Sequence, residues 1–308
     1  MGAIQMYTSI GGIEQWIEIG GDSPDNPVLL FLHGGPGASS RFAAMALKPW
    51  QRHFTVVHWD QRGAGRTLAR NGEAGCGRLT IERMIDDAIE VSEYLTNHLG
   101  KDKIILLGHS WGSVLALNMI RRRPELFAAY VGTGQVVNMR RNEEFNYVRQ
   151  LTQARAAGNE QAVAALEEIG PPPYQDRAKI RLLREWADVA ASGTGDDPRP
   201  RPPARPTNLT PEDIQLIPAG FLFSGNQLFE ELCEIDLSAL GLDFPIPMFC
   251  FMGAEDQQTA FALAETWFAS LNAPRKAFVR FEGCHHFVVM NRPEMFLEQL
   301  LKHVVPAI

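Results

Sequence analysis

Five short apolar runs, separated by helical stretches, constrain the fold of this chain more than any other feature. They lie at 28–35, 54–60, 103–110, 246–253 and 276–283, and each ends in a glycine or a polar turn. Near-continuous apolar runs are typical of parallel strands that are buried on both faces. Since such runs alternate with helical patterns, the sequence predicts an α/β fold with a doubly wound, mostly parallel sheet.

Other segments extend the same pattern. The alternating run at 13–20 predicts an outer strand, and 128–137 predicts one more buried strand. Thr80 and Gly100 are residue types that begin and end helices, and the helix after residue 111 should stop before Pro124. Helices are therefore expected at 79–100, 112–127 and 292–305.

The pattern changes between 138 and 240, where the chain is helical, charged and broken by loops. We interpret this segment as a helical cap inserted between two core strands, with residues 1–137 and 241–308 forming the core domain. The cap should cover the carboxyl ends of the strands, where ligands bind in such sheets. Within it, DPRPRPPARP at 197–206 predicts an exposed, extended loop.

Composition excludes several kinds of protein. The chain has 308 residues, 45% of them hydrophobic, and a net charge of −7, which argues against a nucleic-acid partner. It has neither a secretory signal nor the 18 apolar residues that a membrane span needs, so we expect a cytoplasmic protein without a membrane partner. No cofactor or metal site is expected, and reduced thiols are the simplest interpretation of Cys76, Cys233, Cys250 and Cys284.

The stretch from Gly108 to Gly112, with the sequence G-H-S-W-G, places Ser110 between a predicted strand and a predicted helix. Glycines two residues to either side allow the tight turn that exposes a nucleophilic serine at the top of a sheet. The helix that follows favours a developing negative charge at its N-terminus. Ser110 is therefore the candidate nucleophile.

A serine hydroxyl needs a base, and the base needs an orienting acid. His285 and His286 follow the last predicted strand, and Glu255 and Asp256 follow the strand before it. This order of serine, acid and histidine along the chain is the order of α/β-hydrolases. By residue type alone, either acid and either histidine would serve.

An oxyanion hole is the remaining requirement. The backbone N–H of Trp111, directly after the nucleophile, is one expected donor. The turn His33-Gly34-Gly35-Pro36-Gly37 follows an earlier strand, and the N–H of Gly35 is the expected second donor. Such a donor typically contributes about 3 kcal/mol to transition-state stabilisation.

The chain resembles the proline iminopeptidase group of α/β-hydrolases. The resemblance rests on HGGPG at 33–37, DQRGAGRT at 60–67, HSWGS at 109–113, G-x-x-D at 253–256 and H-F…P-E-x-F at 286–296. It covers the expected core domain and implies the α/β-hydrolase fold. It also implies a choice between the alternatives, with Asp256 as the acid and His286 as the base.

The chain departs from this group at two places. His109 stands where the group usually has glycine, and the cap lacks the Trp-Glu pair whose carboxylate holds a substrate amine in the group. The nearest pattern, Arg184-Glu185-Trp186, has the reverse order. We take Glu185, Trp186 and Glu230 as candidate substrate-binding residues, with neighbouring acids in the same cap segment at 231 and 234.

These features predict a serine hydrolase that cleaves an amide through an acyl-enzyme on Ser110. The resemblance implies an aminopeptidase that releases an N-terminal residue, proline among the candidates, from a short peptide. The alternative is an esterase, lactonase or amidase that acts on a small metabolite with the same triad. Epoxide hydrolases and dehalogenases need an aspartate in place of Ser110, and a catalytically inactive binding protein is the remaining hypothesis.

Overall fold

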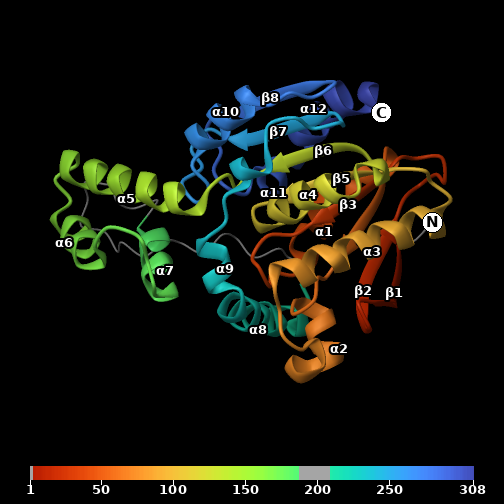
Figure 1. Cartoon of the computed structure of the whole chain (residues 1–308), viewed down its shortest axis with the longest axis horizontal. Helices are drawn as coiled ribbons and strands as arrows, with labels where there is room; N and C mark the ends of the chain where they lie inside the picture. The colour runs from red at the N-terminus through yellow and green to blue at the C-terminus, as the bar shows by residue number, and fades with distance from the viewer. Residues whose placement is uncertain (1–2, 187–208) are drawn as a thin grey trace.

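The computed structural model describes residues 3–186 and 209–308, and its centre is one eight-stranded sheet with the order β1-β2-β4-β3-β5-β6-β7-β8 (Figure 1). All neighbours from β4 to β8 pair in parallel, whereas β1 and β2 form an antiparallel hairpin that joins the sheet through β4. The prediction of a mostly parallel sheet is confirmed. The strands are β1 Ile4–Ile10, β2 Ile13–Gly20, β3 Val28–Leu32, β4 Thr55–Trp59, β5 Ile104–His109, β6 Phe127–Thr133, β7 Met248–Gly253 and β8 Lys276–Phe281.

One prediction about the sheet edge is wrong. The strand expected at 13–20 is present as β2, but it is not the outer strand, because β1 pairs along its whole length. Gly11 and Gly12 connect the two strands with positive φ angles of 56° and 77°, a conformation that glycine adopts without a steric penalty. The sequence pattern did not identify β1, whose residues are mostly exposed or half-buried.

Helices cover both faces of the sheet. On β5, Leu106 belongs to the core formed with α3, α4 and α10, whereas Leu107 belongs to the core formed with α1, α11 and α12. Burial on both faces is why β5 reads as a continuous apolar run. The helices are α1 Arg41–Leu47, α2 Gly65–Cys76, α3 Ile81–Leu99, α4 Trp111–Arg122, α5 Met139–Ala156, α6 Glu160–Ile169, α7 Arg177–Glu185, α8 Pro211–Gln227, α9 Phe229–Cys233, α10 Phe261–Ser270, α11 Val288–Asn291 and α12 Pro293–Gln299, with 3₁₀ turns at Lys48–Arg52, Pro124–Leu126, Leu237–Leu240 and Val305–Ala307 and a π turn at Leu300–Val304.

The expected bounds of α3 and the expected end of α4 before Pro124 agree with the structure, whereas the helix expected at 292–305 is α-helical only over Pro293–Gln299 and continues as a π turn and a 3₁₀ turn. The side chain of Thr80 accepts a hydrogen bond from the Arg83 N–H at 3.1 Å, and Gly100 closes α3 in the left-handed conformation. Helix α4 ends at Arg122, before Pro124, as expected. These signals are local, which is why the sequence alone reveals them.

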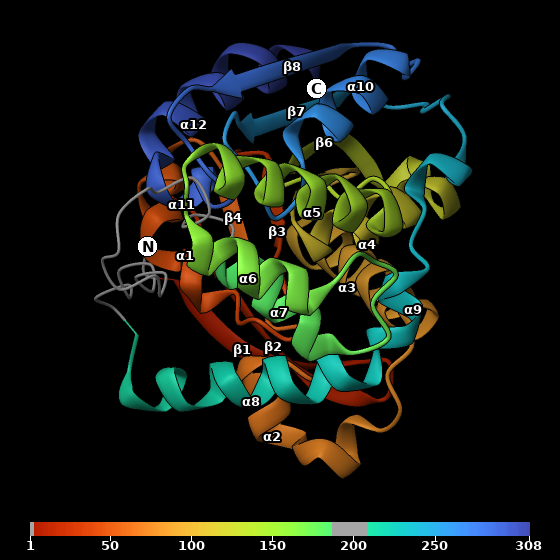
Figure 2. The same ribbon diagram turned by 90° about the vertical axis from the view of Figure 1, so that its left-hand side faces the viewer.

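Helices α5 to α9 lie between β6 and β7, within the segment expected to form a cap. Helices α5, α6 and α7 project from one side of the molecule and cover the end of the sheet in the second view, while α8 crosses below them (Figures 1 and 2). The projecting helices share a small core of their own that includes Tyr147, Leu166 and Leu183. The division into two domains stays a prediction, and the loop expected at 197–206 lies outside the described residues.

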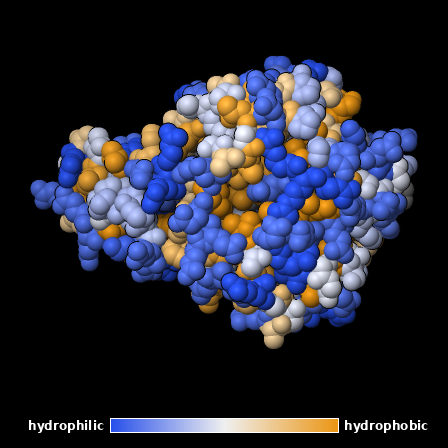
Figure 3. Space-filling model, viewed as in Figure 1, coloured by the Kyte–Doolittle hydropathy of each residue, from blue (hydrophilic) through white to orange (hydrophobic). Residues whose placement is uncertain are grey.

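Helices α8 and α9 are bound directly to the core. The Ser224 hydroxyl donates a hydrogen bond of 2.8 Å to the carbonyl of Gly63, and a Cβ atom on Gly220 would lie 2.3 Å from the carbonyl oxygen of Gly37. The carboxylate of Glu231 accepts a hydrogen bond of 2.9 Å from the Ile81 N–H at the start of α3. Seen from the same side as in Figure 1, the molecular surface is mostly hydrophilic, and apolar side chains gather near the middle of this view (Figure 3).

Two observations bear on the classes of protein considered above. Among the described residues, no helix combines the length and apolar character that crossing a membrane requires. The same part of the chain contains no group of three or more histidine, cysteine or acidic side chains arranged to hold a metal ion.

The DQRG segment contributes a buried ion pair between Arg62 and Asp87, with Nε 2.7 Å from Oδ2. We expect Arg62→Ala to lower the free energy of unfolding by about 3 kcal/mol, because it leaves a carboxylate buried with fewer partners. Arg83 and Gln15 still contact Asp87, which keeps the loss at the low end of the usual range. Urea unfolding of the variant and the wild type measures this difference in the free energy of unfolding.

The matched control is Arg70→Ala, which breaks an ion pair with Glu14 in which both side chains are about half exposed. An exposed pair contributes about 0–1 kcal/mol. Equal losses for the two variants would contradict the structural role assigned to the Arg62 pair.

Candidate active site

Ser110 lies at a strained turn between β5 and α4. Its φ of 54° and ψ of −119° make it the one non-glycine residue with a positive φ in the described part of the chain. Its N–H donates to the carbonyl of Thr133 at 2.9 Å. Cβ atoms on Gly108 and Gly112 would lie 2.8 and 2.0 Å from backbone carbonyl oxygens, so only glycine fits at either position. The strain is retained by this packing and presents the hydroxyl to the cavity above the sheet.

His286 and Asp256 form a buried pair at the same edge of the sheet, with His286 Nδ1 2.9 Å from Asp256 Oδ2. Asp256 follows β7, and His286 follows β8. The other Asp256 oxygen accepts the backbone N–H groups of Gln258 and Thr259 at 2.9 and 3.0 Å, and the Thr259 hydroxyl donates to Oδ2 at 2.9 Å. Each carboxylate oxygen therefore has donors that fix its orientation.

The surroundings of Asp256 keep it ionised. Burial alone would raise its pKa, but the His286 charge and the hydrogen bonds from His286 and Thr259 outweigh burial and lower the pKa below its ordinary value. Because a carboxylate only accepts hydrogen bonds, the Nδ1 atom of His286 carries the proton. The Nε2 atom is then free of a proton, as a general base requires.

The imidazole of His286 packs on the turn after β6, where a Cβ atom on Gly134 would lie 2.7 Å from its Cε1 atom. Among the described residues, no hydrogen bond joins this imidazole to the hydroxyl of Ser110. In hydrolases without substrate this contact is often long and shortens when substrate binds. The structure thus pairs the predicted acid with the predicted base and places Ser110, the predicted nucleophile, at a separate turn, and the catalytic roles of all three stay predictions.

Gly35 and Trp111 both line the cavity beside Ser110. Trp111 is the first residue of α4, so its N–H has no acceptor within the helix. Neither this N–H nor that of Gly35 donates to any acceptor in the part of the chain that the structure describes. Two unpaired N–H groups beside the nucleophile are what an oxyanion hole needs, and their role as donors stays a prediction.

Gln61 connects the two turns that carry these donors, a role that the sequence did not reveal. Its Nε2 donates to the carbonyl of His33 at 3.1 Å, and its Oε1 accepts from the indole N–H of Trp111 at 2.9 Å. Its backbone N–H donates to Nε2 of His33 at 3.2 Å, so His33 is protonated on Nδ1 and donates to the carbonyl of Gly34. Burial lowers the pKa of His33 to about 4, which keeps this link neutral.

The residues next to the predicted acid, base and nucleophile in the sequence have other partners. His285 is about half exposed and lies 3.4 Å from Glu255, which is equally exposed, so this pair points away from the buried acid and base. His109 is buried, and its Nε2 donates to the backbone carbonyl of His286 at 3.2 Å. Burial, followed by the charge of His286, lowers the pKa of His109 to about 3, so it is a neutral support for the His286 loop.

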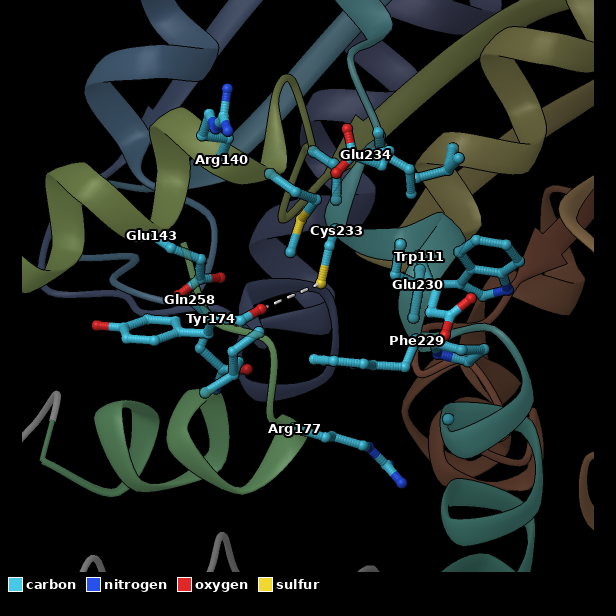
Figure 4. A pocket seen from close by; sticks show the side chains of 18 of the residues that line it. Trp111, Arg140, Glu143, Tyr174, Arg177, Phe229, Glu230, Cys233, Glu234 and Gln258 are labelled. Atoms are coloured by element: carbon cyan, nitrogen blue, oxygen red, sulfur yellow. Dashed lines mark hydrogen bonds between the residues drawn. The ribbon is translucent and has the colours of Figure 1, made fainter. Parts of the chain in front are cut away.

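A cavity of about 720 Å³ opens above Ser110, between the core and helices α5, α7, α8 and α9. Figure 4 shows Glu230 beside Trp111, and Glu143 beside Tyr174 and Gln258. The charged residues in its wall are Glu143, Glu230, Glu234, Arg140, Arg177 and Arg184. A pocket of this size and charge suits a small ligand that carries charged groups.

Of the three cap residues predicted to bind substrate, Glu230 lines the cavity and Glu185 and Trp186 do not, while the neighbouring acid Glu234 also lines it. Glu185 is exposed and lies 3.6 Å from Arg181 on the outside of α7, and Trp186 packs against the small core of the projecting helices. The assignment of Glu185 and Trp186 to substrate binding does not fit this geometry. Sequence reasoning also missed Glu143, a buried cavity residue on α5 that lies 3.4 Å from Arg184.

Comparison with known proteins places this geometry in a family. The family model for the alpha/beta hydrolase fold matches residues 27–293. The chain is 30% identical over 309 residues to the probable aminopeptidase YbaC of Bacillus subtilis (strain 168), covering 98% of this chain and 96% of that one. It is 32% identical over 123 residues to the proline iminopeptidase of Lactobacillus delbrueckii subsp. lactis, 37% of each chain.

Among solved structures, the proline iminopeptidase-related protein TTHA1809 of Thermus thermophilus shares the fold, with a TM-score of 0.65, 23% identity and full coverage of both chains. The chain therefore belongs to the α/β hydrolase family. The predicted fold class and the predicted resemblance are both confirmed.

Proposed function

We propose that this protein is a serine aminopeptidase that removes the N-terminal residue of a short peptide through an acyl-enzyme. The observation that carries the proposal is a cavity lined both by the strained Ser110 and by the carboxylate of Glu230, which has no ion-pair partner among the described residues. Similarity to a probable aminopeptidase over nearly the whole chain supports the proposal.

In the proposed reaction, His286 Nε2 takes the proton of the Ser110 hydroxyl as the oxygen attacks the carbonyl carbon of the N-terminal residue. Asp256 stabilises the imidazolium that forms, and the N–H groups of Gly35 and Trp111 stabilise the oxyanion. The imidazolium then protonates the leaving amine, and water releases the acyl group by the same steps.

Glu230 is the carboxylate that we assign to the free amine of the substrate. It lines the cavity beside Trp111 and has no cationic partner among the described residues (Figure 4). By contrast, Glu143 already accepts from Asn142 at 3.3 Å and lies against Arg184. A charge-assisted hydrogen bond from an ammonium group to Glu230 would hold the adjacent carbonyl over Ser110.

The test compares aminoacyl 4-nitroanilides that have a free amine, proline and alanine among them, with their N-acetylated forms and with acyl 4-nitrophenyl esters. We expect turnover of the free-amine amides, and a kcat/KM about 10- to 100-fold lower after acetylation, the effect of losing one charge-assisted hydrogen bond. In Glu230→Gln the effect of acetylation should largely disappear. Turnover of esters alone would contradict the proposal.

A further inference from the structure

Two arginines of the cavity wall, Arg140 and Arg177, have no ion-pair partner among the described residues, and of the two only Arg177 is held in place by hydrogen bonds there. Arg177, the first residue of α7, donates from Nη1 to Oδ1 of Asn226 at 2.9 Å and from Nη2 to the carbonyl of Phe221 at 2.6 Å. Both acceptors are neutral. No carboxylate of the described chain lies within ion-pair distance of this guanidinium.

The fold holds this guanidinium in a fixed position. A Cβ atom on Gly225 would lie 2.2 Å from Nη2 and 2.3 Å from Cζ of Arg177, so the group lies directly on the surface of α8 where a side chain is missing. Two acceptors and this contact orient the guanidinium before any ligand binds. A guanidinium has five N–H donors, so this arrangement leaves three of them for a ligand.

The neighbouring charges have the same sign. Arg184 lies in the same cavity wall, and Arg181 lies one turn along α7. Burial, followed by the charges of these two arginines, lowers the pKa of Arg177 below its ordinary value. Arg184 has Glu143 as a partner and Arg181 has Glu185, whereas Arg177 is repelled by both arginines and has no carboxylate partner among the described residues. A bound anion would relieve this repulsion.

The two ends of a short peptide carry charges opposite to those of Glu230 and Arg177. The N-terminal ammonium group is complementary to Glu230, and the C-terminal carboxylate is complementary to Arg177. Glu230 lies beside Trp111, whereas Arg177 lies on the side of the cavity formed by α7 (Figure 4). We propose that Arg177 binds the C-terminal carboxylate of the substrate, so that the enzyme prefers dipeptides and tripeptides with a free C-terminus over longer or C-terminally blocked peptides. This inference rests on the aminopeptidase function proposed above.

The experiment measures kcat/KM for a dipeptide and for the same dipeptide with its C-terminus amidated, by release of the N-terminal residue. The wild-type enzyme should favour the free acid by about 10- to 100-fold, the effect of one hydrogen bond between charged groups. In Arg177→Gln this ratio should fall to near unity, and Arg177→Lys should retain part of it. Turnover of an aminoacyl nitroanilide, which has no C-terminal carboxylate, should change little in either variant.

Two further variants separate loss of the anion site from damage to the fold. Gly225→Ala keeps every charge but displaces the guanidinium, so it should lower the ratio as Arg177→Gln does. Arg181→Gln removes an exposed arginine from the same helix and should leave the ratio at its wild-type value. A wild-type ratio near unity, or an unchanged ratio in both Arg177→Gln and Gly225→Ala, would overturn the inference while nitroanilide turnover still supports the aminopeptidase. Absence of turnover on every aminoacyl substrate would overturn both the carboxylate-binding role of Arg177 and the aminopeptidase function.

Discussion

Ser110→Ala should lower kcat by about a millionfold, the loss seen when a triad serine is removed from a hydrolase. The hydroxyl is the nucleophile in the proposed reaction, and the described structure offers no second hydroxyl at this turn with the same exposure to the cavity. The binding cavity and the oxyanion donors do not depend on the hydroxyl. We therefore expect KM to change far less than kcat. Steady-state kinetics on the best nitroanilide measures both, with Ser270→Ala, a serine on α10 far along the chain, as the control.

The same position gives a second readout. Ser110 has a positive φ, which costs a side chain of order 1 kcal/mol or more and which glycine adopts freely. Ser110→Gly should therefore be more stable than Ser110→Ala by about 1 kcal/mol while being equally inactive. Residual activity within tenfold of wild type in either variant would contradict the assignment of the nucleophile.

Asp256→Asn should lower kcat by about 10⁴-fold, with little change in the fold. The Oδ1 atom of Asp256 accepts two backbone N–H groups, so the carbonyl oxygen of an asparagine would take that place. Its NH₂ group would then face Nδ1 of His286 and donate to it. Since Nδ1 would then accept, His286 would hold its proton on Nε2 and could not take a proton from Ser110.

Glu255→Gln is the matched control for this variant. Glu255 is the adjacent acid, but it is half exposed and lies against His285, away from the buried pair. Its replacement should leave kcat within about twofold of wild type, as expected for a surface pair of little energetic weight. If Glu255→Gln proved the more damaging change, the choice of Asp256 and His286 over their neighbours would be wrong.

The core could be predicted from the sequence because its signals are local. Leu106 and Leu107 pack into opposite cores, so β5 had to be apolar at successive positions. The strain at Ser110 needs glycines at fixed spacing, and these are visible in the sequence. Asp256 and His286 follow consecutive strands of a parallel sheet, and the carboxyl ends of such strands meet at one edge.

The cap residues could not be predicted in this way, because their roles depend on how the helices dock. Glu230 and Glu231 are neighbours in one short helix, yet one lines the cavity while the other accepts from the first turn of α3. Glu143 lies in a helix whose polar residues show no periodic pattern, and it is buried only once α5 has packed with the other cap helices, where it lies against Arg184. Gln61 belongs to the segment DQRGAGRT, on which the resemblance rests. Its hydrogen bonds to His33 and Trp111 depend on three turns that meet only in the folded protein.

The most direct test of the central claim is labelling with a fluorophosphonate, which reacts with a serine that a histidine has activated. After treatment of the folded protein, intact mass and peptide mapping should show one adduct, on Ser110, and His286→Ala should remain unlabelled under the same conditions. An unlabelled wild-type protein, an adduct on another residue, or equal labelling of His286→Ala would contradict the account.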